Sequence, residues 1–185
     1  MLKVEKVEKP EFFNSWIKKN ESWNQVLRKY ILEKEQQHFC CYCEKKVTAY
    51  GEDSHIEHIR PRNKFPKLKN EYNNLLVSCE RKERCGHAKG SRFNEYFIVP
   101  TEENPGDYLT YSPNGEMRPI DNNQKGRETI KILNLNTPAL RDARRVMFIQ
   151  LHGMKNAPGC DEFEKHFNEY PTLITYFKEN YLKQT

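Results

Sequence analysis

A chain of 185 residues with 36% hydrophobic and 31% charged residues can form one domain with a real core, which argues against disorder throughout. The formal charge of +5 permits a nucleic-acid partner without requiring one. No apolar run approaches the roughly 18 to 20 residues of a transmembrane helix, and MLKVEKVEKP alternates charge where a signal peptide would be apolar, so we expect a cytoplasmic protein without membrane association.

The expected elements succeed one another as helices, a compact centre, a hairpin and further helices. Apolar side chains recur at helical spacing in an N-terminal segment (1–38), and this period disappears from a central segment (39–98) rich in cysteines and turn-forming residues. In the next segment (99–126), two strand-like stretches around SPNG predict a hairpin over 107–120. The helical pattern returns in 127–185. We expect the four segments to form one compact domain of the α+β class.

Five of the six cysteines fall between positions 40 and 85, and in a reducing compartment clustered thiols indicate a metal before disulfides. Two pairs have metal-ligand spacing: Cys40 with Cys43, and Cys79 with Cys85. Four thiolates suit a tetrahedral Zn²⁺ and leave no coordination position for water, so the zinc would be structural. Buried free cysteines or disulfides are the alternative. We expect Cys41 to point away from the metal and Cys160 to be a free thiol.

Proton-transfer and ligand side chains lie between and just after the two cysteine pairs: His55, Glu57, His58, Asn74 and His87. This region resembles the HNH endonuclease family. The resemblance is carried by three stretches, IEHIRP, NNLL and CGHAKG, which occur together with the two cysteine pairs in the order expected for that family. The resemblance implies a ββα-metal core, two strands and a helix around one catalytic Mg²⁺ or Mn²⁺, here flanked by N-terminal and C-terminal helices. The residue types agree with it, because hydrolysis of a phosphodiester needs a base that works near neutral pH and a hard cation.

The same resemblance implies a role for each of these residues. His58 would be the general base that activates water. Glu57 and His87 would hold the catalytic metal, and Asn74 would brace the loop that orients the base. Strand alternation puts His58 on the face opposite to His55 and Glu57, so we expect the strand to end or bulge at His58. Without such a change, His55 would replace Glu57 at the metal or join it.

Basic side chains gather near this region and include the candidate contacts to a nucleic-acid backbone: Arg60, Arg62, Lys64 and Lys89. Contacts to phosphate are the natural use of such a cluster, and a solvated charged loop is the alternative. No helix carries the set of side chains that reads base edges, so we expect little sequence specificity.

Further stretches extend the resemblance along nearly the whole chain: HIEHIRP, YNNLLVSC, TIKILNLN and a helix with the pattern L-x-x-A-R-R. They are similar to the PtuB-like branch of the HNH family, which belongs to Septu-type and retron-associated bacterial anti-phage defence. That branch implies an ABC-type ATPase as partner. The arginine-bearing helix over 138–152 and the aromatic C-terminal helices are the candidate docking surfaces.

The expected function is metal-dependent cleavage of nucleic acid, with DNA as the first substrate, by the effector subunit of a defence complex. A ribonuclease that cleaves tRNA or another RNA is the enzymatic alternative, because the same water activation serves either backbone. Two hypotheses without catalysis compete with the enzyme: a zinc-stabilised nucleic-acid-binding module, and an inactive scaffold for the ATPase.

Overall fold

The computed structural model describes residues 1–19, 21–156 and 162–182, so Cys160 lies outside the described residues. Helices alternate with two small antiparallel sheets along the chain, which confirms the α+β class. Buried side chains from all four predicted segments form one connected hydrophobic cluster.

The N-terminal segment is helical, as expected. It forms helix α1 (Phe13–Lys19) and helix α2 (Glu21–Ile31), and a π-helical stretch, Leu32–Gln36, continues α2. On α2, Leu27 and Ile31 are fully buried, Trp23 and Tyr30 are partly buried, and Val26 is exposed. This buried side is what fixes α2 to the central segment.

The central segment contains a two-stranded sheet followed by a short helix. Strand β1 (Ser54–His58) pairs with strand β2 (Leu75–Cys79) in a regular one-to-one register that places His58 opposite Leu75. Every residue of β2 is buried, because α2 packs against both strands and helix α3 (Cys85–Lys89) contacts β2. Strand, strand and helix follow one another in the order expected for a ββα unit.

Strands β3 (Leu109–Tyr111) and β4 (Met117–Pro119) form the hairpin expected over 107–120. Its turn requires a glycine at position 115, where φ is +80° and a Cβ atom would overlap the carbonyl oxygen of Arg141. The turn therefore packs directly against the helix that carries Arg141.

Three helices follow the hairpin: α4 (Gln124–Leu133), α5 (Pro138–Met154) and α6 (Pro171–Phe177). Thr137 is the N-cap residue of α5, and its side chain accepts a hydrogen bond from the Leu140 amide at 3.4 Å. Arg144 on α5 is only 2% exposed, and its guanidinium donates to the carbonyl oxygens of Leu135 and Leu140. This arginine therefore stabilises the interior, and only part of the arginine set on this helix remains at its surface.

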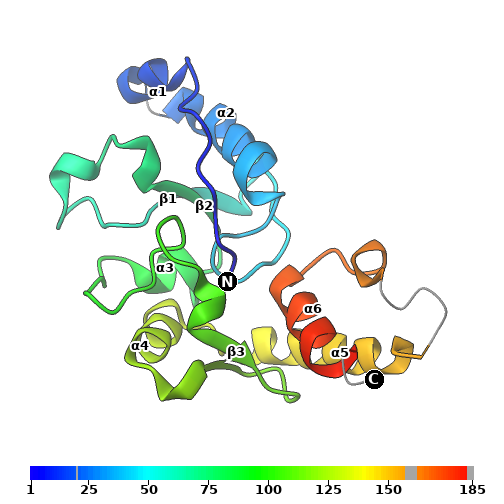
Figure 1. The fold of residues 1–185 in the computed structure, drawn as a ribbon. Coiled ribbons are helices and arrows are strands. Elements are labelled where there is room, and N and C mark those ends of the chain that lie inside the picture. Colours follow the sequence, from blue (N-terminus) through cyan, green and yellow to red (C-terminus); the bar gives the residue numbers. More distant parts are fainter. Residues whose placement is uncertain (20, 157–161, 183–185) are drawn as a thin grey trace.

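Figure 1 shows α1 and α2 above the β1–β2 sheet, with α3, α4 and β3 below it. Helices α5 and α6 lie together at the lower right. Among the residues that the structure describes, no helix is long and apolar enough to cross a membrane.

Candidate functional site

Four cysteine side chains meet in the interior: Cys40, Cys43, Cys79 and Cys85. Their sulfur atoms all lie within 4.8 Å of one another, and all four residues are buried. The first pair lies on a tight turn after α2, the third cysteine ends β2, and the fourth begins α3. The described cysteines form no disulfide, and Cys41 is buried outside this group. The two predicted pairs therefore come together as one cysteine cluster.

A buried arginine borders the cysteine cluster. Arg84 directly precedes Cys85, is 6% exposed, and its Nε atom has no hydrogen-bond partner among the described residues. Burial lowers the pKa of the Arg84 guanidinium, but its interactions with Cys43, Cys79 and Cys85 raise it by more, so this pKa lies above its ordinary value. A cation held against sulfur atoms favours thiolates, the form of cysteine that binds metal. The cysteine cluster can therefore hold a metal such as zinc.

A second group of candidate metal ligands is partly exposed beside the central sheet: His55, Glu80 and His87. The carboxylate of Glu80 bridges the two rings, with Oε2 2.6 Å from Nδ1 of His55 and Oε1 2.7 Å from Nε2 of His87. The three ligand atoms lie within 4.8 Å of one another. His55 is on β1, Glu80 follows β2 directly, and His87 is on α3, so this histidine cluster joins all three elements of the central segment.

Glu57 lies next to the histidine cluster but is only 6% exposed. Its Oε1 atom is 2.7 Å from Nζ of Lys89 and accepts a hydrogen bond of 3.1 Å from the hydroxyl of Tyr42. Its Oε2 atom lies 3.6 Å from Nε2 of His55. Burial raises the pKa of Glu57, but His55 and Lys89 lower it by more, so the carboxylate is ionised at neutral pH. Burial also lowers the pKa of His55, while Glu57 and Glu80 raise it above its ordinary value.

Gly86, the second residue of α3, leaves room for these ligand atoms. A Cβ atom at this position would lie 2.6 Å from Nε2 of His55 and 2.7 Å from Oε2 of Glu57, closer than real side chains approach. The backbone of α3 therefore lies directly against the two atoms that face each other on β1, and only glycine permits that approach.

His58 is the last residue of β1, and the strand ends there without a bulge. Regular alternation keeps His55 and Glu57 on one face, while the Nε2 atom of His58 lies 2.9 Å from the carbonyl oxygen of Lys69. Because a carbonyl oxygen only accepts hydrogen bonds, Nε2 carries the proton and Nδ1 of the neutral ring carries the lone pair. Burial, assisted by the positive charge of Arg62, lowers the pKa of His58 below its ordinary value.

Asn74 ties together the loop that follows His58. Its Oδ1 atom accepts from the Arg60 amide at 2.8 Å, and its Nδ2 atom donates to the carbonyl oxygens of Arg60 at 3.0 Å and Leu68 at 3.1 Å. Leu68 precedes the residue whose carbonyl contacts the His58 ring. Asn74 is buried, so this bracing holds the loop from the inside.

The four basic residues expected at a nucleic-acid backbone are in different environments. Arg62 and Lys64 are exposed. Arg60 forms a bidentate ion pair with Glu102, at 2.7 and 2.9 Å. Lys89 does not lie at the surface as its basic neighbourhood in the sequence predicts, because it is 2% exposed and its ammonium group neutralises the buried carboxylate of Glu57. Its surroundings assign it to the interior of the site rather than to a phosphate contact.

No family model matches the chain. A protein from Bacillus thuringiensis named Septu protein PtuB is 29% identical over 122 residues, which cover 63% of this chain and 44% of that protein. A second Septu protein PtuB, from Bacillus mycoides (strain KBAB4), is 28% identical over 157 residues, which cover 68% of this chain and 50% of that protein. The chain is therefore similar to PtuB proteins over about two thirds of its length. It spans about half the length of the curated PtuB relatives it matches.

Sequence reasoning missed two residues that the fold brings to the histidine cluster or to Glu57 beside it. Glu80 is hidden among basic residues in the sequence, but His55 pairs with Ser78, and Glu80 lies two residues further along on the same face. Strand register was therefore the signal that could have found it. Tyr42 stands within the cysteine motif, where its contact with Glu57 depends on the fold and has no sequence signal.

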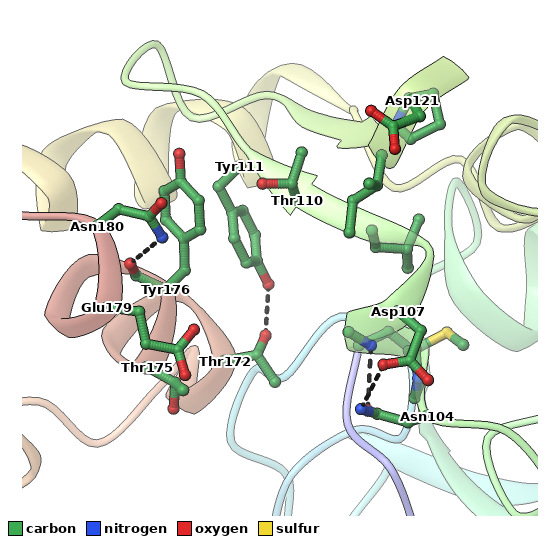
Figure 2. A pocket seen from close by; sticks show the side chains of 16 residues that line it. Asn104, Asp107, Thr110, Tyr111, Asp121, Thr172, Thr175, Tyr176, Glu179 and Asn180 are labelled. Atoms are coloured by element: carbon green, nitrogen blue, oxygen red, sulfur yellow. Dashed lines mark hydrogen bonds between the residues drawn. The ribbon is translucent and has the colours of Figure 1, made fainter. Parts of the chain in front are cut away.

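A cavity of about 740 Å³ lies apart from both clusters, lined by residues around β3 and along α6. Figure 2 shows Tyr111 in its wall, with its hydroxyl 2.6 Å from that of Thr172, so a hydrogen bond links β3 to α6 there. Three carboxylates, those of Asp107, Asp121 and Glu179, also line it. None of the residues expected in catalysis or metal binding lines this cavity, so it is separate from the candidate site.

Proposed function

We propose that the protein is a metal-dependent endonuclease of the HNH type and a component of Septu anti-phage defence. Its similarity to PtuB proteins supports the defence role. The observation that carries the nuclease is the combination of side chains at the end of β1. Glu57 lies beside His55, and the next residue in the sequence, His58, carries a neutral imidazole.

The catalytic cation would be held by Glu57, His87 and His55, with Glu80 as a further ligand. Supporting this, Oε2 of Glu57 faces His55, and Glu80 bridges His55 and His87. Bound Mg²⁺ or Mn²⁺ would neutralise negative charge on the phosphate and on the leaving oxygen. Because the carboxylate of Glu57 is ionised, it can serve as a ligand without first losing a proton.

His58 would take the proton from the attacking water through its Nδ1 atom. The lowered pKa of His58 keeps the ring neutral at pH 7, which is the form a general base needs. The carbonyl of Lys69 fixes the tautomer, and Asn74 holds the neighbouring carbonyl of Leu68, so the loop orients the base. Arg62 and Lys64 would contact phosphate from their exposed positions.

As the effector subunit of a defence complex, the protein would act with an ABC-type ATPase. Exposed apolar side chains on α5 support this helix as the docking surface, because Val146 is 47% and Ile149 is 58% exposed. DNA is the proposed substrate, and RNA is the alternative that the same chemistry would serve.

The test is a cleavage assay on DNA and on RNA with Mn²⁺, using the chain alone and co-purified with the product of a neighbouring ATPase gene. His58→Ala should lower the cleavage rate by about 10² to 10⁴ while nucleic-acid binding is retained. His166→Ala, at an exposed histidine remote in sequence from the site, is the matched control and should cleave like the wild type. Cleavage by His58→Ala at the wild-type rate would refute the proposed base, and binding without cleavage in every sample would indicate a binding module instead.

A further inference from the structure

The cysteine cluster and the carboxylate of Glu57 are built on the same two short stretches of chain. Tyr42 lies between Cys41 and Cys43, and its hydroxyl donates to Oε1 of Glu57 at 3.1 Å. Gly86 follows Cys85 directly, and its Cα faces Oε2 of the same carboxylate, since a Cβ atom there would lie 2.7 Å away. Each cysteine pair therefore places a neighbouring residue against Glu57.

These contacts are buried and tightly packed. Tyr42 is fully buried, Glu57 is 6% exposed and Lys89 is 2% exposed. The ring of Tyr42 packs edge-on against Phe97, with the ring centres 6.2 Å apart. A phenol confined in this way can move only if the turn that carries Cys40 and Cys43 moves with it.

The two oxygens of Glu57 have different tasks. Oε1 is occupied, because both Lys89 at 2.7 Å and Tyr42 at 3.1 Å contact it. Oε2 faces Nε2 of His55 at 3.6 Å, on the side of the histidine cluster. Holding Oε1 fixes the rotation of the carboxylate, so Oε2 stays directed toward the place where a cation would bind.

We propose that Tyr42 is a positioning residue through which the cysteine cluster sets the affinity of the neighbouring site for its divalent cation. The metal-filled turn fixes the phenol, the phenol fixes Oε1 of Glu57, and Oε2 is thereby presented together with His55. The inference rests on the proposed function, since it takes Glu57 as a cation ligand. It adds that filling the cysteine cluster would affect the neighbouring site through the buried hydrogen bond between Tyr42 and Glu57.

The experiment is a titration of zinc-loaded protein with Mn²⁺, followed by calorimetry or by the electron paramagnetic resonance signal of free Mn²⁺. Tyr42→Phe removes the hydroxyl and keeps the ring, so the zinc content and the melting temperature should remain close to those of the wild type. Its Mn²⁺ affinity should fall by about 10-fold to 100-fold, as expected when a group that orients a metal ligand is lost.

Tyr111→Phe is the matched control. Tyr111 is also buried, and its hydroxyl also donates to a carboxylate, that of Glu44 at 3.2 Å, but it lies on β3 away from the histidine cluster. It should bind Mn²⁺ like the wild type. Glu57→Gln should lose Mn²⁺ affinity while it retains zinc, which establishes that the carboxylate is the ligand being positioned.

The outcomes separate this inference from the proposed function. If the wild type binds Mn²⁺ and cleaves nucleic acid while Tyr42→Phe binds Mn²⁺ equally well, the coupling is refuted and the nuclease stands. If Tyr42→Phe loses zinc, the phenol supports the turn rather than the carboxylate, and the inference is again refuted. If the wild type binds no Mn²⁺ and cleaves nothing, both proposals fail together.

Discussion

Replacing Lys89 with methionine tests the central electrostatic contact of the site. The ammonium group of Lys89 lies 2.7 Å from Oε1 of Glu57, and the two residues are 2% and 6% exposed. Lys89→Met keeps most of the apolar stem but leaves a buried carboxylate without its cation. Removal of one partner of a buried ion pair destabilises a protein by about 3 to 5 kcal/mol. Lys89 also donates to the carbonyl oxygen of His58 at 3.0 Å, so we expect a loss within this range rather than below it.

The assay is urea unfolding of zinc-loaded protein, from which the free energy of unfolding is obtained. Lys178→Met is the control, because Lys178 forms an ion pair of the same length, 2.7 Å, with Glu164 in a more exposed setting. Exposed pairs contribute about 0 to 1 kcal/mol, so the control should change stability little. The double variant Lys89→Met/Glu57→Gln should recover much of the loss, since it removes the unpaired charge.

The pH dependence of the loss follows from the same contact. In the wild type the pKa of Glu57 is below its ordinary value, so the stabilisation is present above the unfolded pKa and disappears as the pH falls through the folded pKa. In Lys89→Met the loss should shrink toward acid pH, because a protonated Glu57 no longer needs a cation. A loss no larger than that of Lys178→Met, or a double variant no more stable than Lys89→Met, would refute the reasoning.

Two further predictions concern the site geometry and the base. Gly86→Ala would place a methyl group 2.6 Å from Nε2 of His55 and 2.7 Å from Oε2 of Glu57. The Mn²⁺ affinity and the cleavage rate should therefore each fall by a factor of about 10². Gly153→Ala is the control and should change neither quantity, because nothing lies within 4 Å of a Cβ atom at that position. The cleavage rate of the wild type should rise with pH through a midpoint below 6.5, because burial lowers the pKa of His58 and the base acts when neutral. A midpoint above 6.5 in the pH–rate profile would contradict the burial of this ring.

Features fixed by local spacing could be predicted from the sequence. The C-x2-C spacing lets Cys40 and Cys43 direct their sulfur atoms toward the same metal position from one tight turn. The structure brings this pair together with the second predicted pair in the cysteine cluster. The SPNG turn predicts the β3–β4 hairpin because its preference for a tight turn is local. The regular pattern of apolar residues predicts α2 for the same reason.

Features that depend on partners distant in the chain could not be predicted in this way. Lys89 stands in a basic stretch, and only the packing of α3 on β2 turns it toward Glu57. Glu80 reaches the histidines through the register of β1 with β2. Lys89 and Glu80 both contact side chains that are far away in the sequence. Helical or strand periodicity does not indicate which distant side chain a charged residue will contact.

The use of these buried cations changes what the formal charge of +5 means for a nucleic-acid partner. Lys89 and Arg144 are 2% exposed and Arg84 is 6% exposed, and each is held by groups in the interior, so none of them attracts phosphate at the surface. The positive charge that a phosphate would meet beside His58 comes from exposed side chains such as Arg62 and Lys64. Both lie on the loop that Asn74 braces and whose carbonyl orients the His58 ring. Phosphate binding and orientation of the base thus depend on one loop, and its geometry matters more to the proposed reaction than the net charge of the chain.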